Sequence, residues 1–460
     1  MKVLLINPSY WTGEKIPLGF VNVSTVPLGL CYIAGVLEAR GIPVTIHDMN
    51  KGGRDEKRLR RKISSFDPDI VGITSFTSNF TNAIQVARLV KTEKPGALVV
   101  AGGVHATFMF REILATIPEI DVVVRHEGEY AMAEIAGVLE SGQRFADIPG
   151  IAFREGGRII VTPERPKIQD LDELPFPALH LLDPPVEKYL GNHQIKNLPV
   201  LTTRGCPFTC IFCSTAALHG HQYRVRDNNR VLDEIQSLID RYSVSHISFV
   251  DDNFTMQKNR VFDLCRKMKE RGISVNWGCS TRVDLLSEDL LRTMKGAGCN
   301  DIFFGIESAS QNVLDTIRKG FSVGQARDVI RLTEKTGIKC HCSFILGMPG
   351  ETVRSLDRMA EFVRETRPTG RVLANVLDVL PGTELMERRS VFLPRRRTIT
   401  RPDITRSQLD LLFSFYEVNA KTRELVPIQM PKILVREASS RSPRTDIPVR
   451  NQESIPAEMR

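Results

Sequence analysis

Three cysteines lie within eight residues, in the run Cys206-Pro207-Phe208-Thr209-Cys210-Ile211-Phe212-Cys213. The spacing is C-x3-C-x2-C, and no fourth cysteine follows nearby. Closed structural zinc and iron–sulfur sites have four protein ligands, so three close thiolates indicate a cubane iron–sulfur cluster with one iron open for chemistry. The alternatives are three buried small side chains, or a zinc site completed by a distant histidine. Gly205 and Pro207 beside the first cysteine, with Phe212 before the last, favour the redox-active cluster.

A series of strand and helix patterns must position these cysteines. Strands are predicted at Pro199–Thr203, Ile247–Asp251, Val275–Ser280, Ile302–Ile306, Cys340–Gly347 and Val372–Val379, with helices between them at, for example, Arg230–Tyr242, Val261–Arg271 and Glu288–Ala297. Six such units predict a partial (β/α)6 barrel, and barrel chemistry takes place at the C-terminal rim of the strands. Because the cysteine run follows the first strand, it falls on that rim.

Charged side chains follow three more of these strands. Asp251 and Asp252 end the second strand, where mutual repulsion could raise one pKa or the pair could bind an ammonium group. Helix capping by Asp252 or Asn253 is an equally weighted alternative. Arg282 follows the third strand, where a guanidinium would bind a carboxylate in bidentate fashion; a surface arginine is the alternative. Glu307 ends the fourth strand and requires a partner if it is buried.

The first part of the chain contains another alternation of strands and helices. Strands are predicted at Val3–Asn7, Val44–Asp48, Ile70–Ser75, Leu98–Gly102 and Val122–Arg125, and helices at Leu28–Arg40, Lys57–Phe66, Asn79–Thr92 and Phe108–Ile117. Continuous Val, Ile and Leu strands predict a Rossmann-like parallel sheet covered on both faces, which binds ligands at the carboxyl ends of its strands. Candidate binding residues at those ends are Ser75, Thr77, Gly102, Gly103, His105, Gly128 and Glu129. Taken singly, the glycines fit a tight turn and His105 fits a helix start.

Together these segments resemble the class B radical S-adenosylmethionine (SAM) enzymes, in which a cobalamin-binding domain precedes the catalytic barrel. Besides the cysteine run, the motifs that carry the resemblance are Val26-Pro27-Leu28-Gly29-Leu30, Gly102-Gly103-x-His105-Ala106-Thr107, Arg125-His126-Glu127-Gly128-Glu129, Gly305-Ile306-Glu307-Ser308, Gly347-Met348-Pro349-Gly350-Glu351-Thr352 and Leu380-Pro381-Gly382-Thr383. The resemblance covers about residues 1–390. That family usually has glycine in place of His126. The sequence lacks D-x-H-x-x-G, the motif that supplies a histidine to cobalt in other cobalamin proteins, so no axial ligand is assigned.

The resemblance implies three cofactors and the residues that bind them. Cys206, Cys210 and Cys213 would hold a [4Fe-4S] cluster whose open iron chelates the amino and carboxylate groups of SAM. Phe212, Arg282, Glu307 and Gly347, together with the candidates Asp251 and Asp252, would surround SAM. The residues at the strand ends of the first sheet, Ser75, Thr77, Gly102, Gly103, His105, Gly128 and Glu129, would contact cobalamin. For Glu351 we prefer a first-turn position favoured by the helix dipole.

The resemblance also implies a reaction. The reduced cluster would donate one electron to SAM, giving methionine and a 5′-deoxyadenosyl radical that abstracts hydrogen from an unactivated carbon, and cobalamin would carry a methyl group to the substrate radical. Methylation of a carbon or phosphorus centre is the expected outcome. The alternatives are a cobalamin-dependent radical cyclisation or rearrangement without methyl transfer, as in tetrapyrrole biosynthesis, and a non-enzymatic cobalamin-binding role. Methylthiolation of tRNA is disfavoured, because the N-terminal part lacks three extra cysteines for a second cluster.

The sequence predicts five segments. They are a cobalamin-binding domain (1–144), a connector with a hairpin over Ile151–Val161 (145–197), the radical SAM barrel (198–386), a partly helical C-terminal extension with a helical pattern over Gln408–Thr422 (387–436) and a disordered tail (437–460).

Composition bounds the partners and the compartment. The net charge is +8, and 15 basic against 9 acidic residues lie between 387 and 460, so most of the excess belongs to the C-terminal segment, including Arg395-Arg396-Arg397. A solvated tail explains this better than nucleic-acid binding. Scattered cysteines indicate a reducing compartment, and no apolar stretch approaches the ~20 residues that span a bilayer. We therefore expect a cytoplasmic enzyme with a small-molecule or natural-product substrate and an electron donor such as flavodoxin or ferredoxin.

Overall fold

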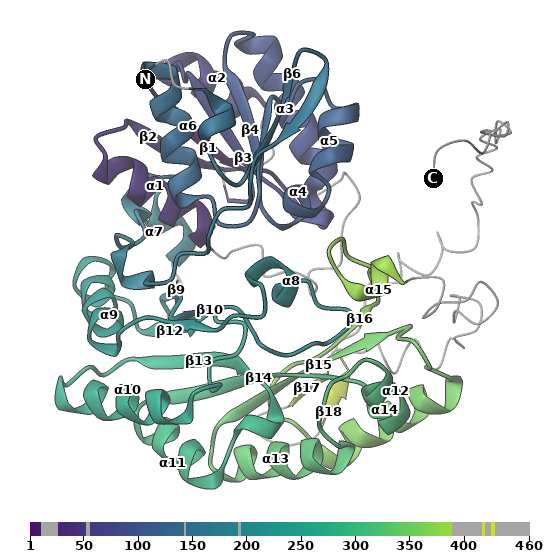
Figure 1. Cartoon of the computed structure of the whole chain (residues 1–460). Coiled ribbons are helices and arrows are strands. Elements are labelled where there is room, and N and C mark those ends of the chain that lie inside the picture. The colour runs from purple at the N-terminus through teal and green to yellow at the C-terminus, as the bar shows by residue number, and fades with distance from the viewer. Residues whose placement is uncertain are drawn as a thin grey trace, which may run out of the picture.

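The computed structural model describes residues 1–10, 26–51, 56–141, 144–191, 195–388, 416–418 and 425–427. Two α/β units lie one above the other, the first in purple to blue and the second in teal to green (Figure 1). Each is built on its own mainly parallel sheet, with eight strands in the first and six in the second.

The first sheet has the strand order β7-β6-β5-β4-β3-β1-β2-β8. Its strands are β1 (Val3–Asn7), β2 (Val44–Asp48), β3 (Ile70–Thr74), β4 (Leu98–Gly102), β5 (Val122–Val124), β6 (Ile151–Glu155), β7 (Arg158–Val161) and β8 (Leu182–Asp183). Strand β1 pairs with β2 on one side and with β3 on the other, so the order reverses there. Ligands of such sheets bind in the crevice outside the carboxyl ends at this point.

Helices cover both faces of the first sheet because successive strand residues point to opposite sides. Val3 and Leu5 belong to the core that contains buried residues of α1 (Leu28–Ala39) and α6 (Glu129–Ser141). Leu4 and Ile6 belong to the core of the other face, with α2 (Glu56–Phe66) and α3 (Phe80–Glu93). The predicted Rossmann-like sheet is thus confirmed.

Two details of the first unit differ from the prediction. The helix expected over Phe108–Ile117 is two helices, α4 (Val104–Phe108) and α5 (Phe110–Thr116), because the backbone leaves the helical region at Met109, with φ −113° and ψ 20°. Segment 145–197 is built into the sheet: β6 and β7 form the expected hairpin and extend the sheet beyond β5 in antiparallel fashion, and β8 extends it beyond β2.

The second sheet is parallel throughout, with the order β16-β15-β14-β13-β12-β9. Its strands are β9 (Asn197–Val200), β12 (His246–Phe249), β13 (Asn276–Thr281), β14 (Cys299–Glu307), β15 (Lys339–Leu346) and β16 (Val372–Val376). Its main helices are α9 (Asn228–Tyr242), α10 (Lys258–Glu270), α11 (Glu288–Gly296), α12 (Gln311–Thr316), α13 (Val323–Lys335) and α14 (Val353–Thr366). Neighbouring strands follow each other in sequence, and the first and last are sheet edges. This is the predicted partial (β/α)6 barrel.

The C-terminal part departs from the predicted helix. Strands β17 (Tyr416–Val418) and β18 (Leu425–Pro427) pair antiparallel, so the helical pattern over Gln408–Thr422 is wrong at 416–418, where Tyr and Val favour a strand. The remainder of the predicted extension beyond residue 388, including Arg395–Arg397, and the tail 437–460 lie outside the described residues.

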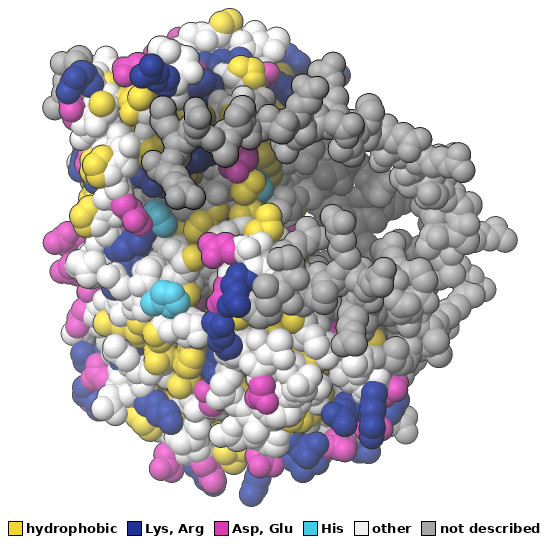
Figure 2. Space-filling model, turned by 45° about the vertical axis from the view of Figure 1, so that its right-hand side comes forward, with side chains coloured by type: hydrophobic (Ala, Val, Ile, Leu, Met, Phe, Trp, Pro, Cys, Tyr) yellow, Lys and Arg dark blue, Asp and Glu magenta, His cyan; other side chains and the backbone are white. Residues whose placement is uncertain are grey.

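The described surface carries mixed charge. Figure 2 shows basic and acidic side chains interspersed over one face, most clearly on the lower unit. No helix in the described ranges is long and apolar enough to cross a membrane.

Candidate active site between the two sheets

The three clustered cysteines lie in one loop between β10 (Thr203–Arg204) and α8 (Thr215–His219), and β10 follows the first barrel strand, β9. Cys206, Cys210 and Cys213 are partly exposed, whereas the other cysteines, Cys31, Cys265, Cys279, Cys299, Cys340 and Cys342, are buried. The loop therefore does not consist of buried small side chains. The cysteine loop lies at the C-terminal rim of the barrel strands, as the sequence analysis predicts.

Gly205 fixes the path of the chain into this loop. Its φ is +91°, and a Cβ at this position would lie 2.1 Å from the carbonyl oxygen of Gln222. Residues with a side chain rarely adopt this backbone conformation, and here they would also collide with backbone. A glycine before Cys206 is therefore required for this course.

The donor set is compatible with a cluster. Across the described residues, no three or more His, Cys, Asp or Glu side chains converge closely enough to hold one metal ion. A cubane binds each thiolate through a different iron, so its ligands need not converge on one point. Nδ1 of His219, the histidine that follows the loop, lies 3.2 Å from Nη2 of Arg224.

Two cations stand beside Cys210. Nη1 of Arg282 lies 3.9 Å from Sγ of Cys210, and its guanidinium carbon lies 3.7 Å from the ring centroid of Phe208. Burial raises the pKa of the Cys210 thiol, and the charges of Lys319 and Arg282 oppose that shift. Burial also raises the pKa of Cys206, to about 11. Positive charge at this point would stabilise thiolate ligands of an anionic cluster.

Lys319 also pairs with the predicted residue Glu307. Its Nζ lies 3.0 Å from Oε1 of Glu307, and both side chains are buried. The same Nζ lies 5.8 Å from the ring centroid of Phe212. The structure thus gathers Phe212, Arg282 and Glu307 around Cys210, and their contacts with SAM stay a prediction. Sequence patterns did not reveal Lys319, because it follows the short helix α12 and not a strand.

The adjacent residues Asp251 and Asp252 accept hydrogen bonds from different segments at the rim of the barrel. Asp251 is buried, and its carboxylate accepts hydrogen bonds from the backbone N–H and the hydroxyl of both Thr202 and Thr203. Burial raises its pKa, and these donors oppose the shift. Asp252 accepts hydrogen bonds from Gly205 N at 3.2 Å and from Thr215 Oγ1 at 3.1 Å, on either side of the cysteines.

The capping alternative for this pair is wrong. Helix α10 begins at Lys258 with Gln257 as its N-cap, so neither Asp252 nor Asn253 caps it. The ammonium contact of SAM stays a prediction for both carboxylates, and Asp252 is the one that borders the cysteine loop.

The predicted residue Gly347 directly follows the fifth strand, β15, and its φ is +87°. Its backbone N–H donates to Oε2 of Glu351. Burial raises the pKa of Glu351 to about 7, against the hydrogen bonds from Gly347 and Met348. Helix α14 begins only at Val353, so Glu351 folds back on the turn and does not act as a first-turn residue.

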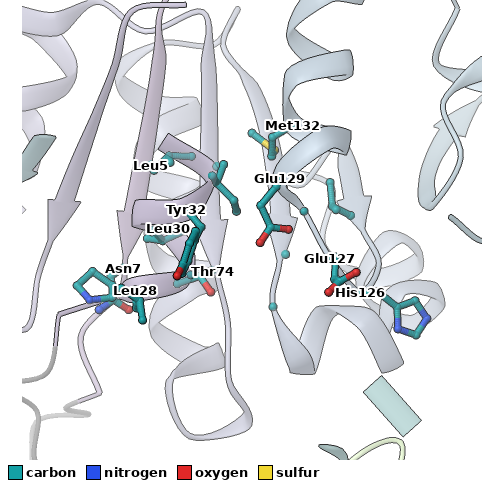
Figure 3. Close-up of a pocket in the computed structure, with 18 of the residues that line it drawn as sticks. Leu5, Asn7, Leu28, Leu30, Tyr32, Thr74, His126, Glu127, Glu129 and Met132 are labelled. Atoms are coloured by element: carbon teal, nitrogen blue, oxygen red, sulfur yellow. The ribbon is translucent and has the colours of Figure 1, made fainter. Parts of the chain in front are cut away.

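A cavity of about 640 Å³ lies over the strand ends of the first sheet (Figure 3). Its lining includes four of the predicted cobalamin residues, Gly102, Gly103, Gly128 and Glu129. The other three hold the adjoining turns: Ser75 Oγ donates to Gly102 O at 3.0 Å, and Thr77 Oγ1 lies 3.1 Å from Nδ1 of His105. A Cβ at Gly103 would lie 2.6 Å from Ser75 O, so these two turns touch.

The barrel closes the other side of this cavity. Its contributions are Leu201, Thr203, Arg204, His219, Val250 and Asp252. Arg204 is buried and donates to Oε1 of Glu127 at 3.0 Å and to Oε1 of Glu129 at 2.5 Å. Burial favours a higher pKa for Glu127, but the hydrogen bond from Arg224 and the charge of Arg204 lower it to about 2. Sequence patterns gave no sign of this ion network, because its partners lie at least 75 residues apart.

His126 occupies a position with φ +64°, where the resembled family usually has glycine. It lines the cavity, and its Nδ1 lies 2.9 Å from Leu218 O in α8, while its Nε2 lies 3.0 Å from Oε1 of Glu164. Burial, with the charge of Lys167, lowers its pKa. His126 therefore ties the first sheet to the helix that follows the cysteines.

Comparison with known proteins agrees with this arrangement. The B12 binding domain family matches residues 15–136, and the Radical SAM superfamily matches residues 200–363. The chain is 35% identical to the Uncharacterized methyltransferase PH0819 of Pyrococcus horikoshii, over 84% of this chain and 83% of that protein. It is 33% identical to the Anaerobic magnesium-protoporphyrin IX monomethyl ester cyclase of Rubrivivax gelatinosus, over 80% of this chain and 66% of that one.

A solved structure shares the fold. The radical S-adenosylmethionine methyltransferase TsrM from Kitasatospora setae, with cobalamin and a [4Fe-4S] cluster bound, superposes with a TM-score of 0.68 at 19% identity, covering 84% of this chain and 74% of that one. The predicted pair of domains, and with it the predicted set of cofactors, is confirmed. The chain is therefore a member of the radical SAM enzymes that carry an N-terminal cobalamin-binding domain.

Proposed function

We propose that this enzyme transfers a methyl group from SAM, by way of cobalamin, to an unactivated carbon or a phosphorus centre of a small biosynthetic intermediate. The observation that carries the proposal is the position of Asp252 between the cavity and the cysteine loop. This carboxylate lines the 640 Å³ cavity and also accepts a hydrogen bond from Gly205, the residue before Cys206. The cavity of the first sheet and the cysteine loop thus share a wall, as methyl transfer between two cofactors requires.

Three thiolates and two cations would form the cluster end of the site. When bound, a [4Fe-4S] cluster with SAM supplies a carbon-centred radical, and cobalamin supplies a transferable methyl group. Cys206, Cys210 and Cys213 would hold the cluster. Arg282 and Lys319 would offset its negative charge and attract the SAM carboxylate, and Glu307 holds Lys319 in place. Phe212 would border the adenine.

Glycines and apolar side chains would form the cobalamin end. Gly102, Gly103 and Gly128 line the cavity wall, and nothing lies within 4 Å of a Cβ at Gly102, so a large planar ligand can approach the backbone closely there. Phe76 and Val250 line the same cavity and are 43% and 40% exposed, which leaves apolar surface free to cover a ligand face. Oε2 of Glu129 is buried without a hydrogen-bond partner and would accept an amide N–H.

A tetrapyrrole-type cyclisation is the second candidate, because a cyclase is among the relatives that match over most of this chain. Both reactions would use the same cofactors, so product mass separates them: methylation adds one methylene unit, whereas cyclisation removes hydrogens or adds oxygen. We favour methylation, because the more similar relative, matched over 83% of its own length, is named as a methyltransferase.

A small electron-transfer protein such as flavodoxin or ferredoxin would reduce the cluster, and the cytoplasm would be the compartment. The buried state of the six cysteines outside the loop, all of them unpaired, supports a reducing environment. The mixed charge of the described surface favours a small molecule over a nucleic acid as substrate.

The test follows two products of SAM in anaerobic, reconstituted protein supplied with cobalamin and a chemical reductant. We expect both 5′-deoxyadenosine and S-adenosylhomocysteine, because only loss of a methyl group yields the second. Cys210→Ala should abolish 5′-deoxyadenosine, whereas Cys265→Ala, which removes a buried thiol outside the loop, should retain it. Formation of 5′-deoxyadenosine without S-adenosylhomocysteine would favour the cyclase, and neither product would refute both.

A further inference from the structure

Arg204 joins the two halves of the active site. It belongs to β10 and lies two residues before Cys206, and β10 pairs with β11 (Arg224–Val225) so that Arg204 stands opposite Arg224. Its buried guanidinium binds one oxygen each of Glu127, in the turn after β5, and Glu129, the first residue of α6. One side chain of the barrel thus holds two carboxylates of the cobalamin-binding domain.

Glu129 offers a contact to whatever fills the cavity. Its Oε1 takes the hydrogen bond from Arg204, while its Oε2 is buried and has no hydrogen-bond partner. Figure 3 shows this carboxylate pointing into the space between the lining residues. A buried carboxylate oxygen without a donor is unfavourable, so an N–H from a bound ligand would fix this side chain. Fixing Glu129 would in turn fix the guanidinium that it binds.

Arg204 and Cys206 are separated by one residue whose backbone is held in place. The one intervening residue, Gly205, is packed against Gln222 O, and its N–H donates to Asp252. A shift of Arg204 is therefore passed to Cys206. Arg224 offers a contrast, because it also binds Glu127 but does not line the cavity, and it belongs to the neighbouring strand β11 and not to the segment that continues into the cysteines.

We propose that Arg204 is a positioning residue that links the two cofactor sites, so that cobalamin and SAM each raise the affinity for the other. This inference rests on the proposed function, because it needs both cofactors. Ordering of Glu129 and Arg204 by cobalamin would order the loop that presents the open iron to SAM. By thermodynamic linkage, SAM must then tighten cobalamin binding by the same factor.

Binding of hydroxocobalamin measures this link without turnover. The full chain, with its cluster reconstituted and left oxidised so that SAM is not cleaved, is dialysed against hydroxocobalamin with and without saturating SAM. In the wild type we expect SAM to lower the Kd for cobalamin by about fivefold or more. Arg204→Gln should bring that ratio to about one while both ligands still bind, and the matched Arg224→Gln variant should keep the wild-type ratio.

Three outcomes would overturn the inference: a ratio of one in the wild type, an unchanged ratio in Arg204→Gln, or an equal loss in Arg224→Gln. If Arg204→Gln fails to fold or to hold iron, Glu129→Gln serves instead, because it keeps the shape and weakens the pairing, and its ratio should fall. These results are independent of the proposed reaction, because no methyl group moves under these conditions. A methyltransferase with a ratio of one would lose only this inference.

Discussion

Lys319 and Glu307 form a buried ion pair, with Nζ of the lysine 3.0 Å from Oε1 of the glutamate. The pair lies beside Cys210, the second of the three cysteines in the loop. Removing one partner of a buried pair leaves the other charge uncompensated. Lys319→Met should therefore lower the free energy of unfolding by about 3 kcal/mol. The control Lys335→Met, at an exposed position in the last turn of α13, should stay within about 0.5 kcal/mol of the wild type. Urea unfolding measures both, and equal values would mean that the pair is not formed in solution.

Gly205 and Gly220 flank the cysteine loop with similar backbone angles, φ +91° and +67°, but different surroundings. A Cβ at Gly205 would lie 2.1 Å from Gln222 O, whereas nothing lies within 4 Å of a Cβ at Gly220. Gly205→Ala should lose most of its bound iron after reconstitution, and Gly220→Ala should keep it, since only the first variant must move the loop. Iron and sulfide analysis decides, and normal iron in Gly205→Ala would contradict the described course of the loop.

His126 combines an unfavourable backbone angle with two useful contacts. His126→Ala keeps φ at +64° and loses the contacts to Leu218 O and Glu164. His126→Gly loses the same contacts but relieves the strain, so it should be more stable than His126→Ala by about 1 kcal/mol. Both should be less stable than the wild type. Chemical denaturation gives the order, and an alanine variant as stable as the glycine variant would show that the angle relaxes.

Glu351 gives the protein a specific dependence on pH. Its pKa is raised by burial to about 7 from an ordinary value of 4.5, so between these values the folded chain binds more protons than the unfolded chain. The contribution of Glu351 to stability is complete below pH 4.5 and is lost as pH rises through 7. Relative to Glu351→Gln, the wild type should lose on the order of 2 kcal/mol between about pH 5 and pH 8. If the free energy of unfolding depended on pH in the same way in both proteins, the burial of the Glu351 carboxyl would be contradicted.

Strand patterns and strand-end residues predicted most of the site. The six barrel strands, the five parallel strands of the first sheet and the rim position of the cysteines follow from apolar runs, whose register is set by burial. Phe212, Arg282 and Glu307 meet at Cys210 because carboxyl ends of parallel strands converge at one edge.

The side-chain pairings that the sequence did not predict join residues that are far apart in the chain. Arg204 acts through Glu129, 75 residues away, and Lys319 through a helix end, and neither pairing has a local pattern. The strands that segment 145–197 adds to the first sheet likewise pair with β5 and β2, which lie far from them in the sequence. Asp252 looked like a cap because a helix follows it, but α10 starts six residues later, at Lys258.

The electron paramagnetic resonance spectrum of the reduced, reconstituted protein, recorded with and without SAM, tests the central claim most directly. We predict about four irons and four sulfides per chain and a cluster signal that changes when SAM is added, because SAM would ligate the iron that no cysteine holds. Zinc in place of iron, or a cluster signal that SAM leaves unchanged, would contradict the assignment of Cys206, Cys210 and Cys213.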